Sequence, residues 1–292
     1  MDRFQRVLLY VDPSRRPDAA FDRAVRLCQE SGSKLRLLAV TPELSVYLRY
    51  PPFSYPSLEE TLRKSAEESL LSLAARAREA GLDVTTDVRH GKPFLEIARE
   101  AAGFGADLVM LDAPTSDRDA KTTAMGLFRL CPGAVWAVRP PAHTYTRILA
   151  PVDPTAYEPR EPGLNREILD TAASLADLDG GRMDVLHAWS AGPGAEAFRE
   201  EIAKAAGEAF EKLVAAYGLP PEQVHLVEDD PADAIRAFVE RNGVDLVVMG
   251  TLVRTGIAGV LIGNTAERAL SALDCSVLAL KPAGFVSPVE DS

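Results

Sequence analysis

An internal repeat is the feature that most constrains how this chain can fold. Short apolar segments at Arg6–Val11 and Arg147–Val152, about 140 residues apart, are each followed by Asp-Pro. At a similar spacing, Ala106–Met110 and Val244–Met249 match almost residue for residue. The chain therefore contains two copies of one structural unit.

Each copy alternates short apolar segments with longer segments whose apolar residues recur at three- and four-residue steps. Such alternation is typical of β-α-β units, which build a parallel sheet covered by helices on both faces. We predict two tandem α/β domains, each a parallel sheet of five strands with helices on both faces. The proline-rich stretch Pro140–Thr144 separates the copies, so the predicted domains are 1–142 and 143–292.

Composition favours a soluble globular protein with a core of ordinary size. Of the 292 residues, 47% are hydrophobic and 26% charged, and the net charge of −11 disfavours direct binding to nucleic acid or to anionic membranes. We recognise neither a signal peptide nor a membrane-spanning apolar segment, so we predict a cytoplasmic protein. The three cysteines are widely spaced, which predicts buried reduced thiols and no metal site.

Two positions in each copy lie where such a sheet binds ligands. Ligands of doubly wound sheets lie outside the carboxyl ends of the strands at which the winding reverses. If the winding reverses between the first and fourth strands of each copy, Asp153 and Gly250 share one crevice in the second copy, and Asp12 and Asp112 share one in the first. Asp112 and the nearby Asp117 would repel an anion, so we interpret the first crevice as degenerate.

The stretch Asp245–Pro282 predicts a strand, a glycine-bearing loop, a helix and a strand. Gly250 ends the apolar strand, and Gly263 precedes Asn264 and Thr265, which suit the N-cap of the following helix. Free amides and the positive end of the helix dipole make such a loop a reasonable cradle for an anion.

This loop, G-T-x-x-R-T-G-I followed by G-N-T-A-E, resembles that of the tandem, E-type universal stress proteins. Nucleotide-binding members of the family carry Gly, two residues, Gly, nine residues, Gly and Ser or Thr. Gly250 and Gly263 match this pattern, whereas Val253 and Asn264 differ from it. The resemblance implies that each domain is a doubly wound, Rossmann-like sheet with strand order 3-2-1-4-5. It also implies a pseudo-twofold pairing of the two copies within the chain, further pairing of chains as a homodimer, and a role in stress tolerance.

The resemblance also implies a nucleotide site in the second copy, with ATP or ADP and Mg²⁺ as its ligand. Adenine or ribose contacts would come from the ends of the first two strands, phosphate contacts from loop amides, and charge compensation from an arginine. The residues of this predicted site are Val152, Asp153, Ala188, Gly250, Thr251, Arg254, Gly263, Asn264 and Thr265.

We identify no catalytic constellation and interpret His187, inside an apolar strand, as a hydrogen-bonded core histidine. The favoured function is non-catalytic ligand binding in stress tolerance, with the site in the second domain. Three alternatives stay open: a slowly hydrolysing ATP switch, a binder of a nucleotide-sugar or acyl ligand, and a ligand-free interaction scaffold. The altered loop chemistry and the aromatic segment at 46–56 would permit the second of these. The charged tail, Val289–Ser292, is predicted to be a disordered end.

Overall fold

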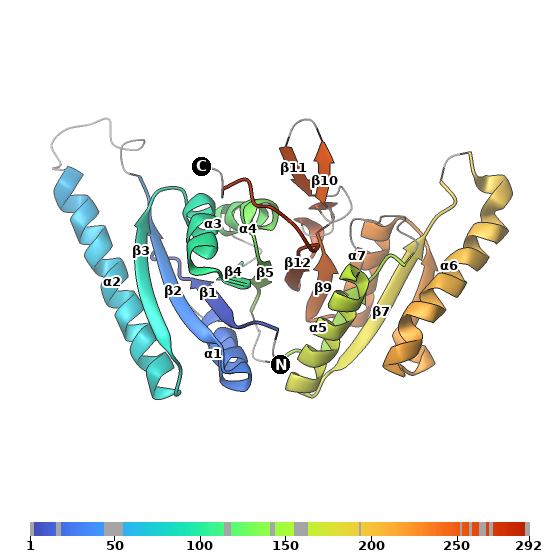
Figure 1. Ribbon diagram of the computed structural model, residues 1–292, viewed down its shortest axis with the longest axis horizontal. Helices are drawn as coiled ribbons and strands as arrows, with labels where there is room; N and C mark the ends of the chain where they lie inside the picture. The colour runs from blue at the N-terminus through green and yellow to red at the C-terminus, as the bar shows by residue number, and fades with distance from the viewer. Residues whose placement is uncertain are drawn as a thin grey trace. The chain divides into compact units, whose positions relative to one another are not determined.

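The chain folds as two units (Figure 1). Unit 1 comprises Met1–His143 together with Val286–Ser292, and unit 2 comprises Thr144–Phe285. The computed structural model describes residues 3–15, 19–43, 55–113, 118–140, 144–154, 163–192, 194–251, 253–256, 259–262, 267–268 and 271–289.

Unit 1 is a five-stranded parallel sheet with helices between its strands. Its strands lie in the order β3-β2-β1-β4-β5, and all neighbouring strands are parallel. Its elements are β1 (Arg6–Tyr10), α1 (Ala19–Ser31), β2 (Lys34–Thr41), α2 (Tyr55–Glu79), β3 (Val84–His90), α3 (Pro93–Phe104), β4 (Leu108–Asp112), α4 (Arg118–Leu130) and β5 (Ala134–Val138).

Unit 2 repeats this plan, with its parallel strands in the order β8-β7-β6-β9-β12. Both units therefore have the order 3-2-1-4-5, and the predicted pair of doubly wound sheets is confirmed. The elements of this unit are β6 (Arg147–Pro151), α5 (Leu164–Asp179), β7 (Arg182–Trp189), α6 (Arg199–Val214), β8 (Val224–Glu228), α7 (Pro231–Asn242), β9 (Leu246–Gly250), β10 (Val253–Gly256), β11 (Gly259–Ile262) and β12 (Ser276–Leu280), with three short 3₁₀ turns at Glu196–Phe198, Ala215–Tyr217 and Pro221–Gln223.

The buried strands account for the apolar runs of the sequence. In β4 and β9 every residue but the last is buried, as expected for central strands that helices cover on both faces. Helices α3 and α7 both begin with proline, whose missing N–H has no partner to lose in the first helical turn. The same sequence signals therefore build the same elements in both copies.

The buried ion pairs differ between the two units. In unit 2 the carboxylate of Asp184, on β7, is fully buried and accepts hydrogen bonds from Arg147 Nε at 2.8 Å and His225 Nε2 at 3.0 Å. Burial acts to raise the pKa of Asp184, but these bonds hold it below its ordinary value. In unit 1 the buried carboxylate belongs to a helix instead, since Glu100 of α3 pairs with Arg36 of β2 at 2.6 Å.

The segment after β9 forms a hairpin where the sequence analysis predicted a loop. Strands β10 and β11 pair antiparallel from Val253 opposite Ile262 to Gly256 opposite Gly259. β-branched residues on both strands favour this pairing over an irregular loop. Residues 267–268 and 271–272 are helical, which agrees with the predicted helix over the part that is described.

The segment just before the predicted disordered tail packs on unit 1, and of the tail itself only Val289 lies within the described residues. Ser287 is fully buried and its hydroxyl donates to the carbonyl oxygen of Leu130, at the end of α4, at 2.5 Å. The Val289 side chain is 9% exposed. The last carbonyl groups of a helix have no partner within it, so Ser287 satisfies one of them from a remote segment.

Candidate functional site

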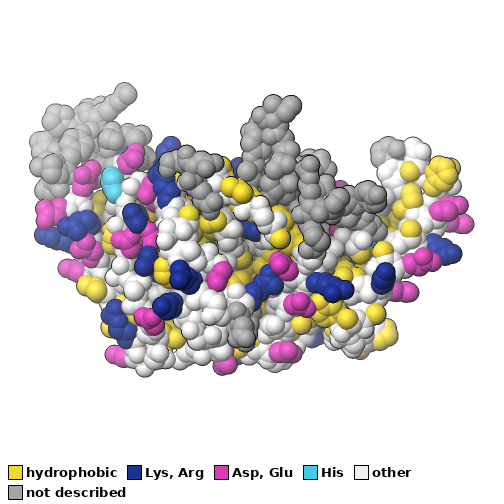
Figure 2. Space-filling view, in the orientation of Figure 1, with side chains coloured by type: hydrophobic (Ala, Val, Ile, Leu, Met, Phe, Trp, Pro, Cys, Tyr) yellow, Lys and Arg dark blue, Asp and Glu magenta, His cyan; other side chains and the backbone are white. Residues whose placement is uncertain are grey.

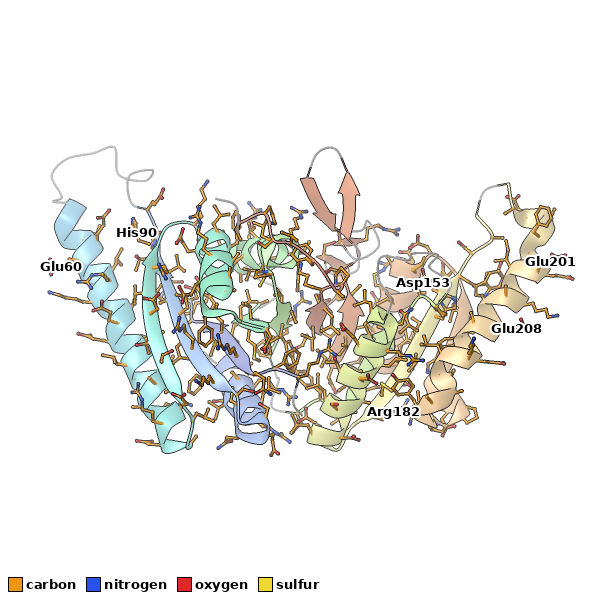
Figure 3. The ribbon with its side chains drawn as sticks, in the orientation of Figure 1. Glu60, His90, Asp153, Arg182, Glu201 and Glu208 are labelled. Carbon is orange, nitrogen blue, oxygen red and sulfur yellow. The ribbon has the colours of Figure 1, made fainter. Side chains whose placement is uncertain are left out.

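The candidate site lies at the carboxyl edge of the sheet in unit 2. Strand β6 pairs with β7 on one side and with β9 on the other, so the ends of these three strands are neighbours. Asp153 follows β6, Ala188 lies near the end of β7, and Gly250 ends β9. In Figure 3, Asp153 marks this edge, and Arg182, the first residue of β7, marks the opposite edge. The fold thus brings these three predicted residues to one edge.

The turn formed by Val152 and Asp153 is held at all four of its backbone polar groups. The Val152 N–H donates to Leu186 at 2.9 Å, and the Val152 carbonyl accepts from His187. The Asn165 side chain accepts from the Asp153 N–H at 3.1 Å and donates to the Asp153 carbonyl at 2.8 Å. These bonds hold the backbone of the turn in one geometry.

His187 is the hydrogen-bonded core histidine that the sequence predicted. Its Nδ1 lies 3.1 Å from the Val152 carbonyl oxygen, which only accepts, so Nδ1 carries the proton. The side chain is 1% exposed and its ring centroid lies 5.6 Å from that of Phe210 on α6. Burial lowers the pKa of His187 below its ordinary value of 6.5, outweighing the hydrogen bond to Val152 and the charge of Asp153. The ring is therefore neutral at physiological pH.

Gly250 and Thr251 are both engaged in packing. A Cβ atom on Gly250 would lie 2.7 Å from Cδ2 of Leu164, the first residue of α5. Thr251 is fully buried, and its N–H and hydroxyl both donate to the carbonyl of Leu280, at 2.9 and 3.1 Å. The N–H and the hydroxyl of Thr251, beside the site, are therefore already bonded within the protein.

The matching edge of unit 1 is chemically different. Asp112, which ends β4 as Gly250 ends β9, accepts a hydrogen bond from the Ala20 N–H at the start of α1, at 2.9 Å. The carboxylate of Asp12 accepts from the N–H and the hydroxyl of Ser14, at 2.9 and 2.6 Å. Two carboxylates thus lie at this edge, and both accept hydrogen bonds from other residues of unit 1.

Some predicted residues have no described side chain. Arg254 lies in β10, of which only the backbone is described, and Gly263, Asn264 and Thr265 fall outside the described residues. Sequence reasoning missed Asn165, which fixes the Asp153 backbone. Its one signal was a short polar side chain at the start of an apolar-periodic helix, a pattern that predicts local capping and not a contact with a strand end.

The described residues also bear on metal binding, membrane insertion and cysteine chemistry. No group of three or more His, Cys, Asp or Glu residues among them is placed to hold a metal ion. Likewise, none of the helices in the described ranges is long and apolar enough to cross a membrane. The thiols of Cys28, Cys131 and Cys275 are buried, as predicted. On the face shown in Figure 2, described acidic and basic side chains are interspersed.

Comparisons with known proteins support the same assignment in both units. The sequence matches the universal stress protein family over residues 3–136 and again over residues 144–281. It is 26% identical to universal stress protein E of Escherichia coli K12, covering 99% of this chain and 98% of that protein. It is also 26% identical to a functionally unknown protein of Pseudomonas aeruginosa PAO1, whose crystal structure superposes with a TM-score of 0.76 over 96% of this chain and 93% of that chain.

A universal stress protein from Archaeoglobus fulgidus has the same fold at 16% identity, with a TM-score of 0.66 over 95% of this chain and 98% of that chain. Both halves of the sequence match the family, and both units have its parallel sheet. The chain therefore belongs to the universal stress protein family and carries two of its domains in tandem.

Proposed function

We propose that this protein is a non-catalytic, cytoplasmic ligand-binding protein in stress tolerance, and that its ligand binds at the carboxyl edge of unit 2. An adenine nucleotide is the first ligand to test, because the loop after β9 resembles that of nucleotide-binding relatives. The Asp153 carboxylate would accept hydrogen bonds from the ligand, and the loop containing Gly263, Asn264, Thr265 and Arg254 would face its phosphates.

The observation that carries this proposal is the contrast between the two strand ends at matched edges. In unit 1 the Asp12 carboxylate is bonded to its own turn, and the Asp112 carboxylate adds a second negative charge. In unit 2 the Asp153 turn is fixed by side chains from β7 and α5, and Gly250 takes the place of the second carboxylate. Arg15 also pairs with Asp12, at 3.5 Å, so the difference that favours an anionic ligand in unit 2 is the glycine that stands in place of Asp112 at the strand end.

Isothermal titration calorimetry of the full chain with ATP and ADP, each with Mg²⁺, tests the proposal. Asp153→Asn removes the charge at nearly constant shape, and we expect it to weaken nucleotide binding about tenfold, as loss of a hydrogen bond to a charged group typically does. Asp12→Asn makes the same change in unit 1 and should leave the affinity unchanged.

Native mass spectrometry of freshly purified protein completes the test. A co-purifying adenine nucleotide would support the proposal directly. An acyl or nucleotide-sugar species would keep the site and replace the ligand. Absence of nucleotide binding in calorimetry, together with an empty protein, would contradict the proposal in favour of an interaction scaffold.

A further inference from the structure

The hydrogen bond from His187 to Val152 joins the core of unit 2 to the turn at the candidate site. We propose that His187 is a positioning residue, which holds the Val152–Asp153 turn in its ligand-binding geometry through its Nδ1–H group. This inference rests on the proposed function, because the turn is where the ligand would bind.

His187 has one polar contact within the described residues, and that contact is with the turn. Its Nδ1 donates to the Val152 carbonyl, whereas its Nε2 is buried without a hydrogen-bond partner among those residues. A buried nitrogen that lacks a partner lowers stability, so an apolar residue would serve the core better. The stabilising contribution specific to a histidine here is the bond that fixes the turn.

Unit 1 shows that the fold itself does not need this histidine. Strand pairing places Tyr10 opposite Leu38 in unit 1 and Pro151 opposite Leu186 in unit 2, so Ala39 corresponds to His187. The sheet of unit 1 forms with alanine at that position. Its turn is closed locally instead, by the hydrogen bonds from Ser14 to the Asp12 carboxylate.

The position of His187 in the sheet gives its ring access to the turn. Val152 extends the pairing of β6 with β7 by one further bond, to Leu186, so the next residue of β7 lies beside the Val152 carbonyl. The ring packs against that of Phe210 on α6, with 5.6 Å between the two centroids. The bond to Val152 is thus made by a donor whose position is set by core packing, and Asn165 completes the constraint from α5.

A pair of substitutions separates this positioning role from simple packing. His187→Asn keeps an N–H near the position of Nδ1, whereas His187→Leu has a similar shape and no donor. Both remove the ring and its contact with Phe210. In the full chain we would measure hydrogen exchange at the amides of Val152 and Asp153, the melting temperature without ligand, and the affinity for ATP with Mg²⁺.

We expect His187→Leu to speed exchange at both amides and to weaken ATP binding about tenfold, the usual effect of losing one oriented hydrogen bond. His187→Asn should stay close to the wild type in both measurements, although it should melt at a lower temperature than His187→Leu, because part of its side-chain amide would be buried without a partner. The amide of Val11, which donates to Leu38 in unit 1, is the internal reference and should not change.

Equal exchange and equal affinity in the two variants would overturn the positioning role and leave His187 as a packing residue. If exchange at the turn rises only in His187→Leu but the wild type binds no ATP, the turn is positioned as inferred and the proposed nucleotide function fails. If affinity falls in both variants while exchange at the turn is unchanged in both, the role of His187 is not exerted through the turn, and the inference is wrong.

Discussion

Gly250 and Asp112 end the matching strands of their units, yet each meets a different packing requirement. The carboxylate of Asp112 binds the first turn of α1 through the Ala20 N–H. In unit 2 the start of α5 comes so close that a Cβ on Gly250 would lie 2.7 Å from Leu164 Cδ2 and 3.2 Å from its Cγ. The close approach of Leu164 therefore explains a glycine at position 250 by packing within unit 2.

A double-mutant cycle at Gly250 and Leu164 tests this explanation. Gly250→Ala should destabilise unit 2 by about 1–3 kcal/mol, the usual effect of overpacking a buried site. In a Leu164→Ala background the added methyl group has room, so its destabilising effect should largely disappear. Hydrogen exchange of the β9 and α5 amides measures both effects. Strictly additive changes would show that the contact with Leu164 is not what requires glycine.

At the scale of elements, the paired helices α3 and α7 differ in how their first turns are capped. In α7 the carboxylate of Asp230 accepts from the N–H groups of Ala232 and Asp233, at 3.0 and 3.3 Å, and also binds Arg268. In α3 the matching residue is Lys92, which makes no side-chain cap although its backbone is extended, as a cap requires. Unit 1 therefore lacks a stabilising contact that unit 2 has.

Removing the cap of α7 and adding a cap to α3 should change stability in opposite directions. Asp230→Ala should destabilise α7 by about 0.5–2 kcal/mol, and Lys92→Asp should stabilise α3 by about 0.5–1 kcal/mol. Asp230→Asn keeps a capping oxygen and removes the charge that pairs with Arg268, so it should change stability little, because that ion pair is exposed. Urea unfolding and amide exchange in α3 and α7 measure these changes. No gain from Lys92→Asp would contradict the assignment of Lys92 as an N-cap.

The sequence predicted elements whose signals are local and missed contacts that depend on how elements meet. The apolar runs of β4 and β9 and the helices that begin with proline could be predicted, because the spacing of apolar residues and the residues that start or end an element all lie within one segment. The bonds from His187 to Val152 and from Asn165 to Asp153 join residues on different elements, so they depend on strand register and side-chain rotamers. The β10–β11 hairpin was missed because its glycines and hydroxyl residues are equally typical of a loop.

At the scale of the whole molecule, the last residues of the chain belong to its first unit. Ser287 and Val289 are buried there, although the segment has no periodicity that predicts packing. Deleting residues 286–292 should therefore destabilise unit 1 by about 1–3 kcal/mol, through lost apolar burial and the lost hydrogen bond to Leu130.

Trp136 lies in unit 1 and Trp189 in unit 2, so a Trp189→Phe background reports on unit 1 alone during urea unfolding. Val286→Ala is the matched control, because the Val286 side chain is 62% exposed and should contribute little. Equal midpoints for the deletion variant and the Val286→Ala control would show that the tail does not contribute to unit 1.

This arrangement has a consequence for how the protein is made. A chain emerges from the ribosome with its N-terminus first, and domains generally fold as they emerge. Here the contacts of Ser287 and Val289 cannot form until the whole of unit 2 has been synthesised. Unit 1 therefore begins to be synthesised before unit 2 but is completed after it. A chain that ends at residue 285 would contain the whole of unit 2 and a destabilised unit 1.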